Sequence, residues 1–224
     1  MTFGCALVVM AAAVGTATAQ DAKATEVLAK TRQALGGAKL EALKTLTIEA
    51  STQRNLGHMQ MASEVEIALE LPDKYLKSET SGRMMNMAMN TGFNGEKAIV
   101  PANATMAGGG AMMIRMGPGG PVGGEAPKLT DEQKAEVNAA SLRSARAELS
   151  RMMLGWFAMA HPSLNATYIY AGEAESPDGK AHVIDVKGTD GFEARLFIDQ
   201  NNYLPLMVTY KGRAPRVVTA GGPM

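Results

Sequence analysis

Sulfur and imidazole side chains gather in two short stretches of the sequence. His58, Met59 and Met61 lie close together, and the segment Met84 to Met87 adds further thioethers. Soft thioether ligands select Cu(I) over the harder divalent ions. A copper-buffering site on His58, Met59 and Met61 is therefore one hypothesis. Strand alternation counts against it, because alternation sends His58 to the face opposite the two methionines.

The number of methionines is the most unusual feature of the apolar composition. There are 17 methionines, whereas aromatic residues make up 5% of the sequence. Thioethers fill irregular gaps in a core and adapt equally well to varied ligands, so two interpretations stay open. The residues form either the lining of a deformable lipophilic cavity or an ordinary core. The candidates are Met59, Met61, Val65, Met85, Met87, Met89 and Phe93 on strands, with Met152, Met153, Trp156 and Phe157 on a helix.

Catalytic chemistry finds little support in the residue pattern. The three histidines, His58, His161 and His182, fall on separate elements, and we expect each of them at the surface. No phosphate-binding loop, glycine-flanked serine nucleophile or histidine-rich metal motif is present. Glu64 and Glu66 are expected on a solvated strand face. The sequence therefore predicts a protein that is not an enzyme and carries no cofactor.

A glycine-rich segment interrupts the pattern between residues 107 and 127. Its glycines and prolines predict a flexible loop without regular structure, yet it carries apolar side chains. One hypothesis is a lid that rests in a cavity mouth, since exposing such groups costs about 0.8 kcal/mol per CH₂. The other is a disordered insertion. The lid candidates are Met112, Met113, Ile114 and Met116.

Residues 1–19 are typical of a secretory signal. The uncharged apolar run Val8 to Val14 is followed by Ala17-Thr18-Ala19, a triplet suited to signal peptidase. We expect residues 20–224 to form a single domain. The single cysteine, Cys5, lies inside the expected signal, which excludes disulfides and thiolate sites from the mature protein.

These residues must be positioned by one amino-terminal helix, a set of strands and a later helix. Asp21 to Leu35 has an apolar stripe at helical spacing, followed by Gly36 and Gly37. Residues 59–71 alternate with a period of two, which indicates one buried and one solvated strand face. Thr130 and Gln133 predict a capping box at the start of the later helix.

Short turns join the expected strands. Asn94-Gly95 and Asp190-Gly191 both favour hairpins. Strands connected in this way form an antiparallel sheet, so the sequence predicts an α+β fold with a curved antiparallel sheet covered by helices. Where the helices cover the apolar face incompletely, a cavity results.

Charge is balanced, with 22 Lys plus Arg against 22 Asp plus Glu. Neither sign forms a long block, so we expect no nucleic-acid partner.

Four segments together resemble the outer-membrane lipoprotein-sorting (LolA/LolB-like) family. They are the helix ending ALGG with the following LEALKTLTIEA, the strand LPDKYLKSET, the hairpin GFNGEKAIV, and the closing RLFIDQNNYLPLMVTY with Asp199 and Leu204-Pro205. The resemblance covers most of Ala24 to Tyr210. It departs from the family in having few aromatic residues and in the segment 107–127.

The resemblance implies an unclosed β-barrel around helices, with an apolar cavity for acyl chains in the periplasm. We therefore expect a monomeric periplasmic carrier or sensor of lipid or lipoprotein acyl chains, with a transient membrane-protein partner. The alternatives are a methionine-rich Cu(I)-buffering protein and an interaction domain with a fully packed core.

Overall fold

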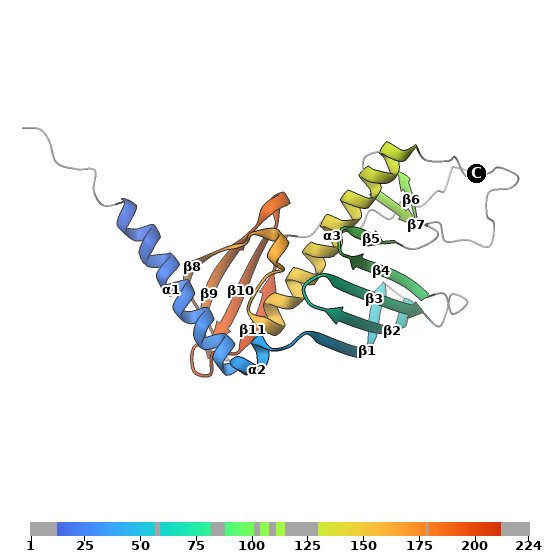
Figure 1. Ribbon diagram of the computed structural model, residues 1–224. Coiled ribbons are helices and arrows are strands. Elements are labelled where there is room, and N and C mark those ends of the chain that lie inside the picture. The colour runs from blue at the N-terminus through green and yellow to red at the C-terminus, as the bar shows by residue number, and fades with distance from the viewer. Residues whose placement is uncertain are drawn as a thin grey trace, which may run out of the picture.

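The computed structural model describes residues 13–56, 59–81, 88–100, 104–107, 111–114, 130–177 and 179–211 of the chain. Two antiparallel sheets flank a long central helix (Figure 1). The amino-terminal helix α1 (Ala13–Ala34) lies beside one of the sheets, and the short helix α2 (Ala38–Glu41) leads into the other.

The first sheet has five strands in the order of the sequence, β1-β2-β3-β4-β5. Each strand pairs with the next through a hairpin, and β1 pairs with β2 over their whole length. The strands are β1 (Thr45–Leu56), β2 (Met59–Glu70), β3 (Lys74–Ser81), β4 (Ala88–Asn94) and β5 (Lys97–Ile99). The Asn94-Gly95 hairpin is confirmed, with Gly95 at φ 60°.

The second sheet has four strands in the order β11-β10-β9-β8. All of its pairings are antiparallel, and the 3₁₀ turn Thr189–Gly191 links β9 to β10 at the predicted Asp190-Gly191 hairpin. The strands are β8 (Thr167–Ser176), β9 (Gly179–Lys187), β10 (Glu193–Asp199) and β11 (Pro205–Thr209).

A short hairpin corrects one expectation from the sequence. Strand β6 (Ala104–Ala107) pairs with β7 (Ala111–Ile114). The prediction that segment 107–127 holds no regular structure is therefore wrong at Ala111–Ile114. The three glycines at 108–110 separate the two strands in the sequence. The remainder of the segment, including Met116, lies outside the described residues.

Helix α3 (Asp131–Phe157) connects the two sheets. Thr130 opens it with the predicted capping box, because its hydroxyl accepts from Gln133 N while Gln133 Oε1 accepts from Thr130 N. The helix continues through Gly155 and ends at Ala158, whose φ of 50° is left-handed. It is followed by the 3₁₀ turn η1 (Pro162–Leu164).

Two buried clusters lie on different sides of α3. One joins Leu154 to Ile184, Val186, Leu196 and Ile198 of the four-stranded sheet. That cluster also takes in Ala24, Val27 and Leu28 of α1, which confirms the predicted stripe on this helix. The other joins Leu142, Leu149 and Met153 to the five-stranded sheet. A single helix therefore supplies core residues to both sheets.

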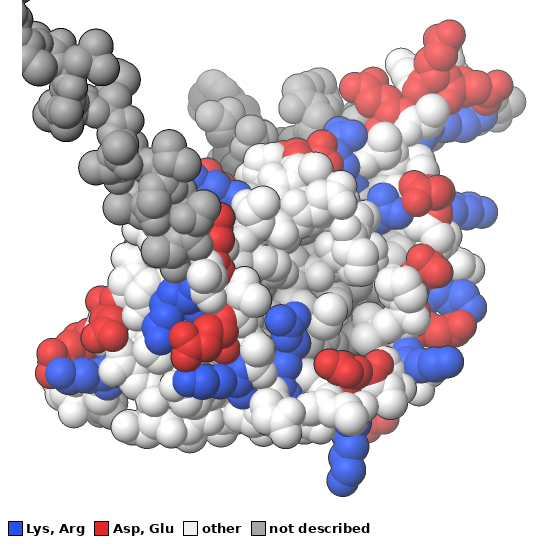
Figure 2. Space-filling view, turned by 60° about the vertical axis from the view of Figure 1, so that its left-hand side comes forward, with Lys and Arg blue, Asp and Glu red and all other residues white. Residues whose placement is uncertain are grey.

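The fold is α+β with open antiparallel sheets, as predicted. The strands form separate sheets rather than one continuous curved sheet, since no pairing among the described residues links the five-stranded sheet to the four-stranded one. Charged side chains of both signs are interspersed on the face shown in Figure 2, in keeping with the balanced composition.

Candidate functional site

The face of the five-stranded sheet that turns toward α3 is built from the odd-numbered residues of β2. Val65, Ile67 and Leu69 are buried, while Glu64 and Glu66 are exposed on the other face. This confirms the predicted period of two. Tyr75 and Phe93 continue the buried face through the register Leu69↔Tyr75↔Phe93, with the two ring centroids 5.9 Å apart.

Burial becomes incomplete toward the β1 edge of this sheet. Nine apolar residues pack against the buried cluster but stay only half-buried, and we call five of them the half-buried cluster. They are Leu46 and Ile48 on β1, Met152 and Trp156 on α3, and Met159 just after α3. Next along β1, Ala50 is exposed although its pairing partner Val65 is buried.

The course of α3 explains this gradient. The helix lies closest to β4 and β5 on one side and to β10 and β11 on the other, and less close to β1. Apolar area left in contact with water costs roughly 25 cal/mol per Å², so the half-buried cluster is a surface that further burial would stabilise.

Polar atoms stand unpaired at the same interface. The Tyr75 hydroxyl and Ser141 Oγ are buried without a hydrogen-bond partner in the described part of the chain. Burial raises the pKa of Tyr75, so this hydroxyl keeps its proton. A buried unpaired polar group costs about 1–3 kcal/mol, and such groups usually meet a ligand or an ordered water.

The face toward α3 is also less apolar than we expected. Lys77 lies in register with Ile67, and its Nζ reaches Glu148 Oε1 on α3 at 2.9 Å. Glu79 lies in register with Val65 and Met89. Sequence reasoning missed this ion pair because β3 shows no polarity alternation. The face on which Lys77 lies is set by the register of β3 with β2, in which Tyr75 pairs with Leu69.

The structure brings several of the predicted cavity residues into one cluster. Val65, Phe93, Met153 and Phe157 are fully buried core residues, and Met89 is half-buried on β4. Met152 and Trp156 are half-buried, and the Trp156 and Phe157 rings meet at 6.1 Å. The side chains of Met59 and Met61 lie outside the described residues, as do His58, Met85 and Met87 and the side chains of the lid candidates. The cavity lining, the lid and the copper site therefore stay predictions there.

His161 contradicts the expectation of a surface histidine. It is 5% exposed, because its ring packs edge-on against Phe93 and η1 folds over it. Nε2 donates to the Pro72 carbonyl at 2.8 Å, and Nδ1 accepts from Ser163 N at 3.2 Å. Burial lowers the pKa of His161, and the charge of Arg146 lowers it further. The geometry fixes a neutral imidazole that joins the β2–β3 turn to η1.

His182 is the second buried histidine, at 7% exposure. It lies on the face of β9 that meets α1, where its ring stacks on Tyr203 and its Nδ1 is 3.1 Å from the Tyr170 hydroxyl. Burial lowers the pKa of His182, as does the charge of Lys23. Its charged neighbours are Lys23, Lys30, Glu26 and Glu173, and the described residues hold no set of three metal ligands here, so we assign it to packing of α1.

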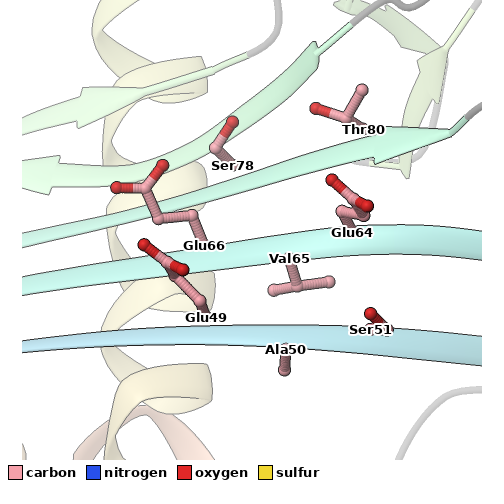
Figure 3. A pocket seen from close by; sticks show the side chains of 8 residues that line it. All are labelled: Glu49, Ala50, Ser51, Glu64, Val65, Glu66, Ser78 and Thr80. Atoms are coloured by element: carbon pink, nitrogen blue, oxygen red, sulfur yellow. The ribbon is translucent and has the colours of Figure 1, made fainter.

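A hollow of about 380 Å³ lies over the five-stranded sheet (Figure 3). Its side chains are mainly polar ones that project from the sheet face opposite Val65 and Ala50. They include Glu49, Glu64 and Glu66. This acidic lining suits neither an apolar chain nor an anion.

In the described part of the chain, no three His, Cys, Asp or Glu side chains lie close enough together to hold a metal ion. Within the same residues, no helix has the length and hydropathy required to cross a bilayer.

Comparison with known proteins yields a distant structural neighbour. A LolA superfamily protein from Nitrosomonas europaea, known from its crystal structure, aligns with a TM-score of 0.43 and 11% identity. The alignment covers 81% of this chain and 68% of that one. No protein-family model matches the chain, and no curated protein matches it. The fold described above therefore rests on the strand pairing and burial of this chain itself.

Proposed function

We propose that the protein is an exported, periplasmic carrier or sensor that binds a lipophilic ligand, such as lipid or lipoprotein acyl chains, at the half-buried cluster. The observation that carries the proposal is that cluster itself, five apolar side chains that lie beside a finished core yet stay partly open to water. An acyl chain laid on them would gain about 0.8 kcal/mol for each CH₂ group removed from water.

Two further features support the proposal. The unpaired Tyr75 hydroxyl lies in the buried cluster against which these five side chains pack, and a buried unpaired polar group usually meets a ligand or an ordered water. Met152 and Met159 supply flexible side chains that adapt to chains of different length. The signal-like residues 1–19 and the sequence resemblance support the export and periplasmic location in this proposal.

Trp156 makes the proposal directly testable, because it is the single tryptophan of the chain and belongs to the half-buried cluster. We expect stearic acid that carries a nitroxide (doxyl) group to quench Trp156 fluorescence in a saturable way. Unlabelled stearic acid should restore the fluorescence by competition. Absence of saturable quenching up to the solubility limit would contradict the proposal.

A matched pair of variants locates the binding face. Ile48→Gln adds a polar group to the half-buried cluster, whereas Leu76→Gln makes the same kind of change on the opposite face, where Leu76 is 36% exposed. We expect Ile48→Gln to weaken binding about tenfold, the effect of about 1.4 kcal/mol, and Leu76→Gln to leave it unchanged. Equal losses in both variants would place the ligand elsewhere.

A further inference from the structure

Arg151 is held by aromatic rings near the carboxyl end of α3. Its guanidinium carbon lies 4.3 Å from the centroid of the Tyr210 ring and 5.8 Å from that of Phe192. Stacking on an aromatic face fixes the plane of a guanidinium and leaves its N–H edges free to donate. Arg151 is therefore preorganised in orientation without being neutralised.

The charge of Arg151 lacks a counter-ion in the described part of the chain. There, no carboxylate forms an ion pair with it, and its Nε is buried without a hydrogen-bond partner. Arg195, by contrast, has a counter-ion, because it donates two hydrogen bonds of 2.6 and 3.0 Å to Asp185. Arg146 likewise pairs with Glu96. A half-buried guanidinium with an unpaired donor fits an anion that the chain itself does not supply.

Arg151 lies on the side of α3 that meets the four-stranded sheet. Gly155, one turn further along the same side, faces Val208 of β11, which a Cβ on this glycine would meet at 3.9 Å. Met152 of the half-buried cluster is the next residue, about 100° further around the helix. Tyr210 follows Val208 with the spacing of residues on one strand face. It is 53% exposed, so the ring that stacks on Arg151 borders solvent.

The nearest carboxylate along α3 already has a partner. Glu148, one turn before Met152 on α3, is already paired with Lys77. The three glutamates of the acidic hollow belong to the opposite face of the five-stranded sheet.

We infer that Arg151 binds the acidic head group of the ligand, a carboxylate or a phosphate, while the apolar chain lies on the half-buried cluster. This inference rests on the proposed function and narrows it to anionic amphiphiles. Tyr210 and Phe192 hold the guanidinium in place, and a bidentate contact satisfies its N–H edge.

The test compares doxyl-labelled stearic acid with its uncharged methyl ester, both read out by quenching of Trp156. We expect the wild-type protein to bind the acid about tenfold more tightly than the ester. Arg151→Met should abolish this preference and leave the ester affinity unchanged. Arg143→Met, a change of the same kind at an exposed site on α3, should keep the preference.

Competition by a single-chain lysophosphatidic acid separates the two head groups. Displacement at lower concentration than stearic acid identifies a phosphate ligand, and the reverse identifies a carboxylate. Should Arg151→Met fail to fold, Arg151→Lys serves instead. It keeps the charge but loses the planar fork, so we expect about a threefold loss for the acid and none for the ester.

Equal affinity for acid and ester in the wild-type protein would overturn the inference and leave the proposed function standing. A preference that survives in Arg151→Met would overturn it too. Binding of neither probe would overturn the proposed function together with the inference.

Discussion

The two sheets bury their α3-facing side chains to different degrees. On β10, Ala194, Leu196 and Ile198 are 7%, 0% and 0% exposed. On β1, the inward-facing Leu46 and Ile48 are only half-buried. β1 is an edge strand, whereas β10 is an interior strand, and the interior strand β2 of the same sheet buries its inward side chains to 8% exposure or less, so strand position accounts for part of the difference.

The number of covering helices also contributes to the difference between the two sheets. The four-stranded sheet packs with α1 at β8 and with α3 at β10 and β11. The five-stranded sheet meets α3 mainly at β4 and β5. Among the described residues, Leu40 and Leu43, in and after the short α2, add cover to its buried cluster. A complete core and an incomplete one therefore coexist, and we place ligand binding at the incomplete one.

The largest effect on stability is expected in the well-covered part of the five-stranded sheet, at Gly92. Gly92 on β4 has φ +152°, and a Cβ there would lie 2.0 Å from the Tyr75 carbonyl oxygen. We expect Gly92→Ala to lower the free energy of unfolding by more than about 4 kcal/mol, because backbone must move. Chemical denaturation measures this loss.

Gly95→Ala is the matched control for that change. Gly95 has φ +60° and an open space around the added Cβ, so only conformational strain of about 1 kcal/mol is expected. Similar losses in both variants would show that the close approach of β3 to Gly92 does not matter.

The same Leu→Ala truncation on each sheet tests the difference in burial between Leu196 and Leu46. Leu196→Ala removes a fully buried side chain and should cost about 3–4 kcal/mol. Leu46→Ala removes a half-buried one and should cost about 1 kcal/mol. Urea denaturation of the two variants side by side measures the contrast, and equal costs would contradict it.

Much of this difference in burial could not be predicted from sequence patterns. Alternation predicted which residues of β2 face inward, and the capping box predicted where α3 begins, because both are local properties. The partial cover of Leu46 and Ile48 depends on where α3 crosses the sheet. The burial of His161 depends on Pro72, 89 residues away in the chain.

The candidate site was predicted in part for the same reason. Met152 and Trp156 follow from helical spacing, and both lie in the half-buried cluster. Arg151 was missed, because its aromatic partners Phe192 and Tyr210 come from the distant four-stranded sheet. Lys77 was missed because the register with β2, rather than its own strand, sets its face.

A smaller effect tests the helix that the two sheets share. Thr130→Ala removes the hydroxyl that accepts from Gln133 N at 3.2 Å. We expect a loss of about 1 kcal/mol, seen as one transition, because α3 contributes to both clusters. Thermal unfolding followed by circular dichroism tests this, and two separated transitions would show that the sheets unfold independently.

The smallest effect is a pH dependence from His161. Its folded pKa lies below the ordinary value of 6.5, so the unfolded chain takes up the proton first as pH falls. Stability is therefore complete above about pH 6.5 and is lost as pH falls through the folded pKa. Arg146 opposes protonation of this ring, whereas Asp73 favours it.

The His161→Gln variant isolates that contribution. Its amide can still donate to the Pro72 carbonyl but does not titrate. We expect the urea midpoint to fall less between pH 7.5 and pH 5 in the variant than in the wild-type protein. An identical fall in both would assign the dependence to carboxylates instead.

Hydrogen–deuterium exchange with and without stearic acid tests the central claim that the less covered sheet receives the ligand. We expect slower exchange at β1 and from Met152 to Met159, at and after the end of α3, with β9 and β10 unchanged. Protection confined to β9 and β10, or no change at saturating stearic acid, would contradict it.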